Sequence, residues 1–219
     1  MTLRFSICLL LVSVALPSES MAQARRGADR DVKHTVRRKN YLIEGVNAAE
    51  LNASMKKNSP KKFNAYTNWE VVWTVSTQTR GSATLLKSFS IQVKSLQTLP
   101  NWKKPKDVST EMLDEWDRYL AALKKHEEGH SRFGLDAAKE MRNTVQAKRW
   151  IARSPDELAK LLSDHCNAIL KKHRSRELDY DRTTGHGVTQ GAVLRQPPEK
   201  PKEDPDDEPD TPESPKSRF

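Results

Sequence analysis

The chain has 219 residues, of which 38 are lysine or arginine and 29 are aspartate or glutamate, giving a formal net charge of +9. The cations are spread along the chain with no RNA- or DNA-binding signature among them, so the charge does not indicate a nucleic-acid-binding protein. Once the two ends are set aside, about 170 residues remain, which is enough for one domain with its own core.

The first 24 residues have the pattern of a secretory signal peptide. A cation precedes an apolar run over residues 5–16, and the small-residue site Ala22-Gln23-Ala24 follows it. This run is shorter than the roughly 20 residues that span a bilayer, and no later segment is apolar for long enough. We therefore predict cleavage after Ala24 and a periplasmic or secreted protein without a transmembrane segment. Cleavage also removes one of the two cysteines, so the mature chain would form no internal disulfide.

The mature chain divides into three parts. Residues 25–39 form a basic N-terminal segment, residues 40–195 a folded domain and residues 196–219 a tail. The tail is rich in proline and acidic residues and has no apolar residue with helical or strand spacing, which predicts disorder. For an exported protein with a basic domain, an anionic polymer of the cell envelope is a candidate partner, although solubility alone also accounts for the charge.

The first elements expected in the domain are a short helix and two strands. Asn47 and Glu50 have the spacing of a capping box, which predicts a helix over residues 48–57. Apolar residues then alternate in WEVVWTVST and again in LLKSFSIQV, which predicts two antiparallel strands joined by a hairpin at Arg80-Gly81. Leu99-Pro100 is expected to end the β region.

The strongest pattern begins near Ser109 and predicts a long helix. Apolar or small residues recur at steps of three and four from Trp116 onward. The same rhythm places Glu127 and His130 on the face that is expected to meet the core, with His126 beside them.

A second helix is predicted to begin at the sequence SPDE. Ser154 can cap this helix, and Pro155 suits its first position. Its apolar stripe continues to Ile169, and the helix is expected to end near Arg176. The glycine- and threonine-rich segment that follows predicts an irregular loop leading into a short strand.

The segment KKHEEGH contains the candidate metal-binding and catalytic residues. His126 and His130 stand at positions i and i+4, so they project from one helix face and can bind one small cation through their imidazole nitrogens. Glu127 is turned about 100° away from the first histidine, so it can hold a metal's water instead of binding the metal. This is the arrangement of a zincin, in which Zn²⁺ lowers the pKa of its water and the carboxylate takes the proton.

A solvent-exposed helix face is the alternative interpretation of KKHEEGH, because lysine and glutamate are ordinary helix-surface residues. The apolar stripe argues against it, since Leu120, Leu123 and Phe133 would bury the motif. A buried His-Glu-His cluster without a metal would need other polar partners. The zinc site is therefore the preferred interpretation.

Beyond this motif, the chain resembles the domain-of-unknown-function family of predicted secreted bacterial zinc-dependent proteases. The resemblance covers most of residues 40–194. It rests chiefly on HEEGH together with YDRTTGHGVTQGA at 180–192, and it is supported by YLIEGVNAAEL, TNWEVVWTV and TLPNW. It implies a metallopeptidase-like domain and leaves the substrate open.

A catalytic zinc needs a third protein ligand. His186 is the first candidate, because Gly185 and Gly187 let the backbone approach closely and because the resemblance supports a role for its YDxxTxHG block. Asp181 is the second candidate, either as a ligand or as a partner that orients a histidine. Tyr180 could donate a hydrogen bond to the oxyanion, with a structural role as the alternative.

Three other residues are weaker candidates for this position. Asp136 lies six residues after His130, but Phe133 stands where a turn glycine would be required. Glu140 lies too far along the same helix, about 15 Å from His130. His165 lies on the apolar stripe of the second helix, where a histidine is more often part of the core.

Together these patterns predict an α+β, zincin-like domain with a small antiparallel sheet, a long helix that carries HExxH and a second packed helix. We expect an exported zinc-dependent hydrolase, specifically a metallopeptidase that acts on a peptide or protein substrate with Glu127 as general base. The competing hypothesis is a non-catalytic, basic envelope-binding protein with a structural or vestigial metal site. Glu127 separates the two, because a structural site has no use for a carboxylate at this position.

Overall fold

Three long strands and a short fourth form a single sheet in the computed structural model, which describes residues 32–198. The strands are β1 (Lys33–Ile43), β2 (Tyr66–Arg80), β3 (Ala83–Trp102) and β4 (Ile151–Ala152). β3 lies between β1 and β2, and β4 pairs with the start of β3. The helices α2 (Ala48–Asn58), α3 (Thr110–Gln146) and α4 (Pro155–Thr184) complete an α+β fold, as predicted.

The sheet is mixed, whereas the sequence predicts an antiparallel one. β2 and β3 form the expected antiparallel hairpin, and Gly81 in its turn has a φ of 59°. β1, however, runs parallel to β3, with Lys33 opposite Gln92 and Ile43 opposite Trp102. β1 could not be predicted from the sequence pattern, because this edge strand is exposed over most of its length and does not alternate apolar with polar residues. Much of the predicted basic N-terminal segment therefore belongs to the sheet.

The predicted helix starts are confirmed by their caps. The Asn47 side chain accepts a hydrogen bond from the Glu50 amide, and the Glu50 carboxylate accepts one from the Val46 amide, in the manner of a capping box. Ser109 and Ser154 cap α3 and α4, and each accepts a bond from the backbone amide three residues later.

α4 is longer than the sequence predicts, and this changes the surroundings of the site. The pattern indicates an end near Arg176, whereas the helix runs to Thr184 and ends at Gly185 in the left-handed conformation. Threonine hydroxyls in the last turn donate to carbonyls one turn earlier, so these polar residues are accommodated in the helix. A 3₁₀ turn, η1 (Val188–Gln190), follows in place of the predicted short strand.

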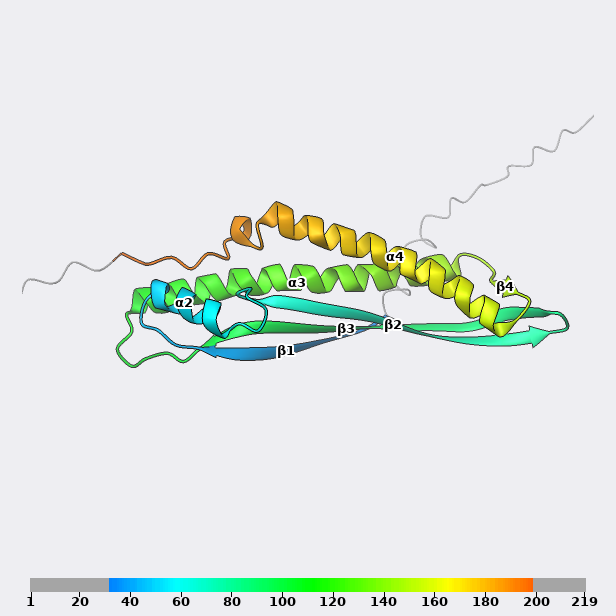
Figure 1. The fold of residues 1–219 in the computed structure, drawn as a ribbon, viewed down its shortest axis with the longest axis horizontal. Helices are drawn as coiled ribbons and strands as arrows, with labels where there is room; N and C mark the ends of the chain where they lie inside the picture. The colour runs from blue at the N-terminus through cyan, green and yellow to red at the C-terminus, as the bar shows by residue number, and fades with distance from the viewer. Residues whose placement is uncertain (1–31, 199–219) are drawn as a thin grey trace, which may run out of the picture.

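The two long helices lie on the same side of the sheet, with α4 alongside α3 (Figure 1). Two clusters of buried apolar side chains lie along α3. One includes Met141 and Leu162, and the other includes Leu51 and Trp116. The HEEGH segment, residues 126–130, lies between the α3 residues of the two clusters, so packing on both sides fixes its position.

The last described residues belong to the folded part of the chain. The Gln196 side chain accepts a hydrogen bond of 3.0 Å from the Ala48 amide at the start of α2. Arg118 on α3 donates to the carbonyls of Gly191 and Val193, which fastens the segment before it. The folded part thus extends to Gln196, which is the first residue of the predicted tail. The predicted signal peptide lies outside the described residues, and no helix within residues 32–198 has the length and apolar character needed to cross a bilayer.

Two truncations test where the folded part ends. Removal of residues 199–219 should leave the melting temperature unchanged, because that segment has no apolar residues spaced to pack as a helix or strand. Removal of residues 196–219 should in addition lose the Gln196 bond, worth about 0.5–1.5 kcal/mol, and lower the melting temperature by about 1–6 °C. Scanning calorimetry of both chains measures the difference. Equal melting temperatures would contradict the contribution of Gln196, and a large loss in the first truncation would mean that the tail packs on the domain.

Candidate metal centre

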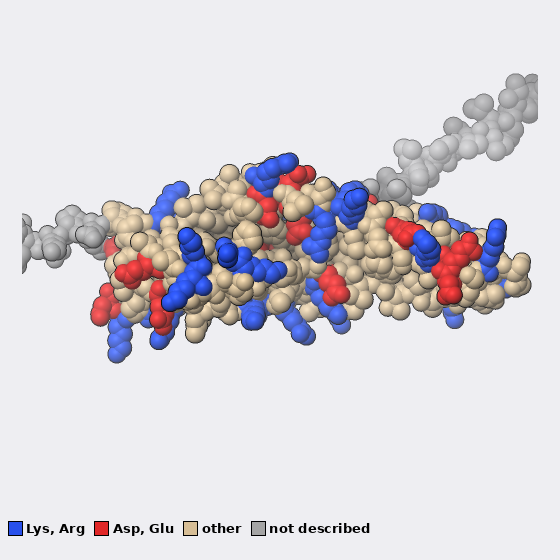
Figure 2. Space-filling view, in the orientation of Figure 1, with Lys and Arg blue, Asp and Glu red and all other residues tan. Residues whose placement is uncertain are grey.

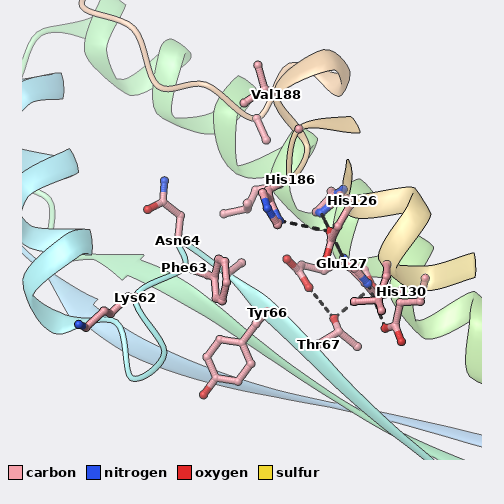
Figure 3. Close-up of a pocket in the computed structure, with 17 residues that line it drawn as sticks. Lys62, Phe63, Asn64, Tyr66, Thr67, His126, Glu127, His130, His186 and Val188 are labelled. Carbon is pink, nitrogen blue, oxygen red and sulfur yellow. Dashed lines mark hydrogen bonds and ion pairs between the residues drawn. The ribbon is translucent and has the colours of Figure 1, made fainter. Parts of the chain in front are cut away.

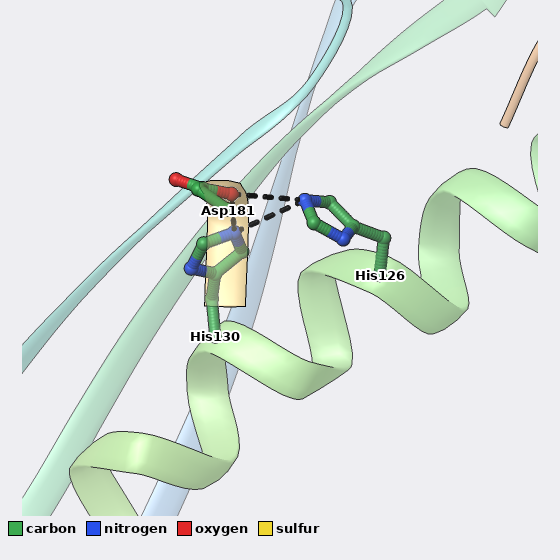
Figure 4. Close-up of side chains that lie close together, drawn as sticks. All are labelled: His126, His130 and Asp181. Atoms are coloured by element: carbon green, nitrogen blue, oxygen red, sulfur yellow. Dashed lines mark hydrogen bonds and ion pairs between the residues drawn. The ribbon is translucent and has the colours of Figure 1, made fainter. Parts of the chain in front are cut away.

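His126 and His130 point from one face of α3 toward a common point (Figure 4). Their Nε2 atoms are 3.2 Å apart. Both residues are buried, with exposed fractions of 3% and 7%. The helix therefore holds the two imidazole rings as the i, i+4 spacing predicts, on the side that faces the protein interior.

Asp181 on α4 completes a triangle of donor atoms (Figure 4). Its Oδ1 atom lies 3.2 Å from the His126 Nε2 and 3.0 Å from the His130 Nε2. A tetrahedral zinc ion with bonds of about 2.0–2.1 Å has ligand–ligand edges of about 3.3 Å. The three atoms therefore have nearly the spacing that one small cation requires, and two histidines with one carboxylate are a donor set found in catalytic zinc sites.

Hydrogen bonds behind the histidines turn their free nitrogens toward Asp181. The His126 Nδ1 lies 2.9 Å from Gln190 Oε1, and the His130 Nδ1 lies 3.1 Å from Glu177 Oε1. Both partners are acceptors, so each Nδ1 carries the proton and each Nε2 presents a lone pair. Asp181 Oδ1 is buried and accepts no hydrogen bond from the described residues. Three donor atoms thus converge on one point, an arrangement that a cation would stabilise.

The charge of the site also favours a cation. Burial lowers the pKa of His126, which keeps its ring neutral and able to bind a metal. Burial acts on His130 in the same direction, but its hydrogen bond to Glu177 and the nearby charges of Asp181 and Glu127 outweigh it and raise its pKa. The carboxylates that attract a proton to His130 would attract a metal ion in its place.

Glu127 lines the cavity in front of these ligands (Figure 3). The residue is 2% exposed, and its Oε2 accepts a hydrogen bond of 2.7 Å from the hydroxyl of Thr67 on β2. Burial raises the pKa of the Glu127 carboxyl group, while the bond from Thr67 acts in the opposite direction. A raised pKa brings a carboxylate closer to the range in which it can take and return a proton at neutral pH.

Glu177 and Gln190 support the histidines, and neither residue was predicted from the sequence. Besides His130, Glu177 accepts hydrogen bonds from the Trp69 indole at 2.8 Å and from Arg174 at 3.0 Å. Burial acts to raise the pKa of Glu177, but these hydrogen bonds outweigh it and lower the pKa. Its four-residue spacing from Asp181 is the signal that could have identified it, and that spacing has meaning only if the second helix extends past Arg176.

Tyr180 lies behind His126 and does not line the cavity. Its ring stacks on the His126 ring with centroids 5.0 Å apart. Its hydroxyl lies 3.2 Å from the His126 carbonyl oxygen and 3.2 Å from Gln190 Oε1. This placement favours the structural role of Tyr180 over the oxyanion role that the sequence analysis considered.

Gly129 leaves the space that Tyr180 occupies. A Cβ atom added at this position would lie 2.3 Å from the Tyr180 hydroxyl oxygen. Alanine is normally favoured over glycine inside a helix. We nevertheless expect Gly129→Ala to lower the free energy of unfolding by about 1–3 kcal/mol, because the ring that backs His126 has to move. Urea denaturation measures this loss, and Tyr180→Ala in the same chain should relieve the clash. A more stable Gly129→Ala protein would contradict this packing.

His186 lies beside the triangle of His126, His130 and Asp181 and not within it. Its side chain is 61% exposed, and its Nδ1 is 3.5 Å from Asp181 Oδ1. Its φ of 53° is left-handed, as are those of the glycines on either side. The structure thus brings Asp181, the second candidate, together with the two histidines. The role of His186 as a ligand stays a prediction.

The weaker candidates have other surroundings. Asp136 is exposed on α3. Glu140 lies 2.9 Å from His173, and His165 lies 2.8 Å from the hydroxyl of Thr144. Asp136, Glu140 and His165 do not line the cavity that contains the triangle, which agrees with their low rank in the sequence analysis.

A cavity of about 460 Å³ opens in front of the metal ligands (Figure 3). Residues 62–67, which lead from α2 into β2, form part of its wall, and residues of the segment after α4 form another part. Its volume suits a small ligand or a short stretch of peptide.

A family model described as "Bacterial protein of unknown function (DUF922)" matches residues 38–187. The match includes HEEGH, Asp181 and His186, and it agrees with the domain-of-unknown-function resemblance seen in the sequence. No curated protein and no solved structure matches the chain.

Proposed function

The chain belongs to DUF922, a family of bacterial proteins of unknown function, and from its site we propose that it is an exported zinc-dependent hydrolase that cleaves peptide bonds. The position of Glu127 carries the proposal, because this buried carboxylate lines the same cavity as the His126–His130–Asp181 group. A metal site that only stabilises a fold is normally closed by four protein ligands. This group offers three ligands and faces a cavity, as a catalytic site requires.

The roles of the side chains follow from their positions. His126, His130 and Asp181 would hold the metal. Bound zinc would supply a water of lowered pKa and would polarise a carbonyl group. The Glu127 carboxylate would take a proton on the cavity side and return it to the leaving nitrogen. Thr67 keeps that carboxylate in place through its hydrogen bond.

Export is part of the proposal, because residues 1–24 have the pattern of a signal peptide. Attachment to an anionic envelope polymer, the competing function, would favour cations gathered on one surface. On the face shown in Figure 2, lysine and arginine side chains are spread along the molecule with acidic side chains between them. The mixed charge of this face, together with the Glu127 carboxylate beside three metal donors, favours the hydrolase.

Metal content and cleavage, measured on the same preparation, test this function. We expect elemental mass spectrometry of the mature chain, made without a polyhistidine tag, to find about one zinc per chain. The loaded protein should cleave an unfolded protein substrate, lose this activity to a chelator and regain it with zinc. The His126→Ala/His130→Ala double variant is the control. A chain that binds no zinc after loading, or a double variant as active as the parent, would refute the proposal.

A further inference from the structure

Three large apolar side chains stand exposed around the cavity that contains the metal ligands. Phe63, Leu178 and Val188 are 50%, 71% and 55% exposed, and all three line this cavity. They come from the loop after α2, from α4 and from η1. Nine large apolar side chains are exposed among the described residues, and the other six lie outside this cavity. Single exposed apolar residues need no explanation, whereas a group that surrounds a functional cavity indicates a binding surface.

Two residues that line this cavity have strained backbone conformations. Lys62 and His186 are the two non-glycine residues with positive φ among residues 32–198, at 63° and 53°, and both line the cavity. Such conformations persist only where the surrounding structure enforces them, and they cluster at ligand sites. Lys62 directly precedes Phe63, whose ring contacts the His186 ring with centroids 5.5 Å apart (Figure 3). The two strained residues therefore bear on the position of Phe63, which follows one of them and contacts the ring of the other.

The exposed rim favours one kind of side chain. A large apolar side chain that covered Phe63, Leu178 and Val188 would remove apolar surface from water, whereas a polar side chain would lose its water without gaining a hydrogen-bond partner from these three side chains. Folded proteins bury most large apolar side chains, whereas unfolded chains expose them.

We propose that Phe63, Leu178 and Val188 form a specificity pocket for a large apolar side chain, such as leucine, next to the bond that is cleaved. The substrates would then be apolar segments of unfolded polypeptides. The position next to a cleaved bond rests on the proposed function, whereas the apolar pocket itself can be tested by binding alone.

The test compares two fluorescent peptides that differ at one position. One carries leucine and the other asparagine, which has a similar shape and no charge, in a sequence otherwise made of glycine, serine and alanine. The protein is the zinc-loaded mature chain with Glu127→Gln, and fluorescence anisotropy gives both dissociation constants. We expect the leucine peptide to bind at least about tenfold more tightly.

Variants of the rim should remove this preference. Phe63→Ser and Val188→Ser should each bring the two dissociation constants closer together, and the triple variant with Leu178→Ser should make them nearly equal. Leu161→Ser is the matched control, because Leu161 is 44% exposed on α4 and does not line the cavity. It should leave the preference unchanged. Melting temperatures would show that all the variants are folded.

Each outcome decides one question. Equal binding of the two peptides, or binding of neither, overturns the pocket. A preference that survives the triple variant also overturns it, because the apolar site would then lie elsewhere. A leucine preference in a chain whose parent cleaves no peptide would keep the pocket and refute the peptidase. Cleavage of peptides without a preference for leucine would support the peptidase and overturn the pocket.

Discussion

Glu127→Gln is expected to slow peptide hydrolysis by about 10²–10⁴-fold while zinc content stays unchanged. Glutamine keeps the size of the side chain and can still accept the hydrogen bond from Thr67, but it cannot take a proton from water at neutral pH. The metal ligands are other residues, so binding of zinc should not depend on this change. Initial rates on an unfolded protein substrate, measured beside zinc stoichiometry, give both quantities.

Glu128→Gln is the control for this experiment. Glu128 is the next residue of the same helix, but its side chain is 61% exposed and its nearest ion-pair partner, Arg38, is 3.7 Å away. The substitution makes the same chemical change outside the cavity, so activity should stay within about twofold of the parent, as expected for a surface change. A fully active Glu127→Gln protein would show that the mechanism is wrong, even if zinc is bound.

The second large effect is expected on zinc affinity, when the third metal ligand is removed. Asp181→Ala is expected to weaken zinc binding by more than the roughly 10–100-fold that loss of an outer hydrogen-bond partner costs, because two histidines alone remain. His186→Ala should keep tight zinc, since its side chain lies outside the triangle of donor atoms. Competition with a fluorescent zinc chelator measures both affinities.

Asp179→Ala is the matched control for Asp181→Ala. Asp179 lies on the same helix, its side chain is 55% exposed, and it pairs with Arg182 at 2.8 Å. Its loss should leave zinc affinity unchanged, which separates removal of a ligand from a general change of helix charge. If His186→Ala loses zinc while Asp181→Ala keeps it, His186 becomes the third ligand, as the sequence analysis first predicted.

Much of the local structure follows from short stretches of sequence. The caps at Asn47, Ser109 and Ser154 start three helices where predicted, because a cap depends on residues only three positions apart. The antiparallel hairpin around Gly81 follows from alternation and a turn residue in the same way. The edge strand β1 does not follow from a short stretch of sequence, because its cations face solvent and its position is set by pairing with β3.

The sequence by itself determined half of the candidate site. One helical turn brings His126 and His130 together, and the apolar stripe of that helix decides that they face inward. Only the tertiary structure decided the other half. Asp181 joins them because α4 continues past its apolar stripe and packs along α3, and the hydrogen bonds of Glu177 and Gln190 then orient the rings. Whether a donor on another helix joins the site depends on how the two helices pack. The spacing of residues along the chain does not give the distance between them.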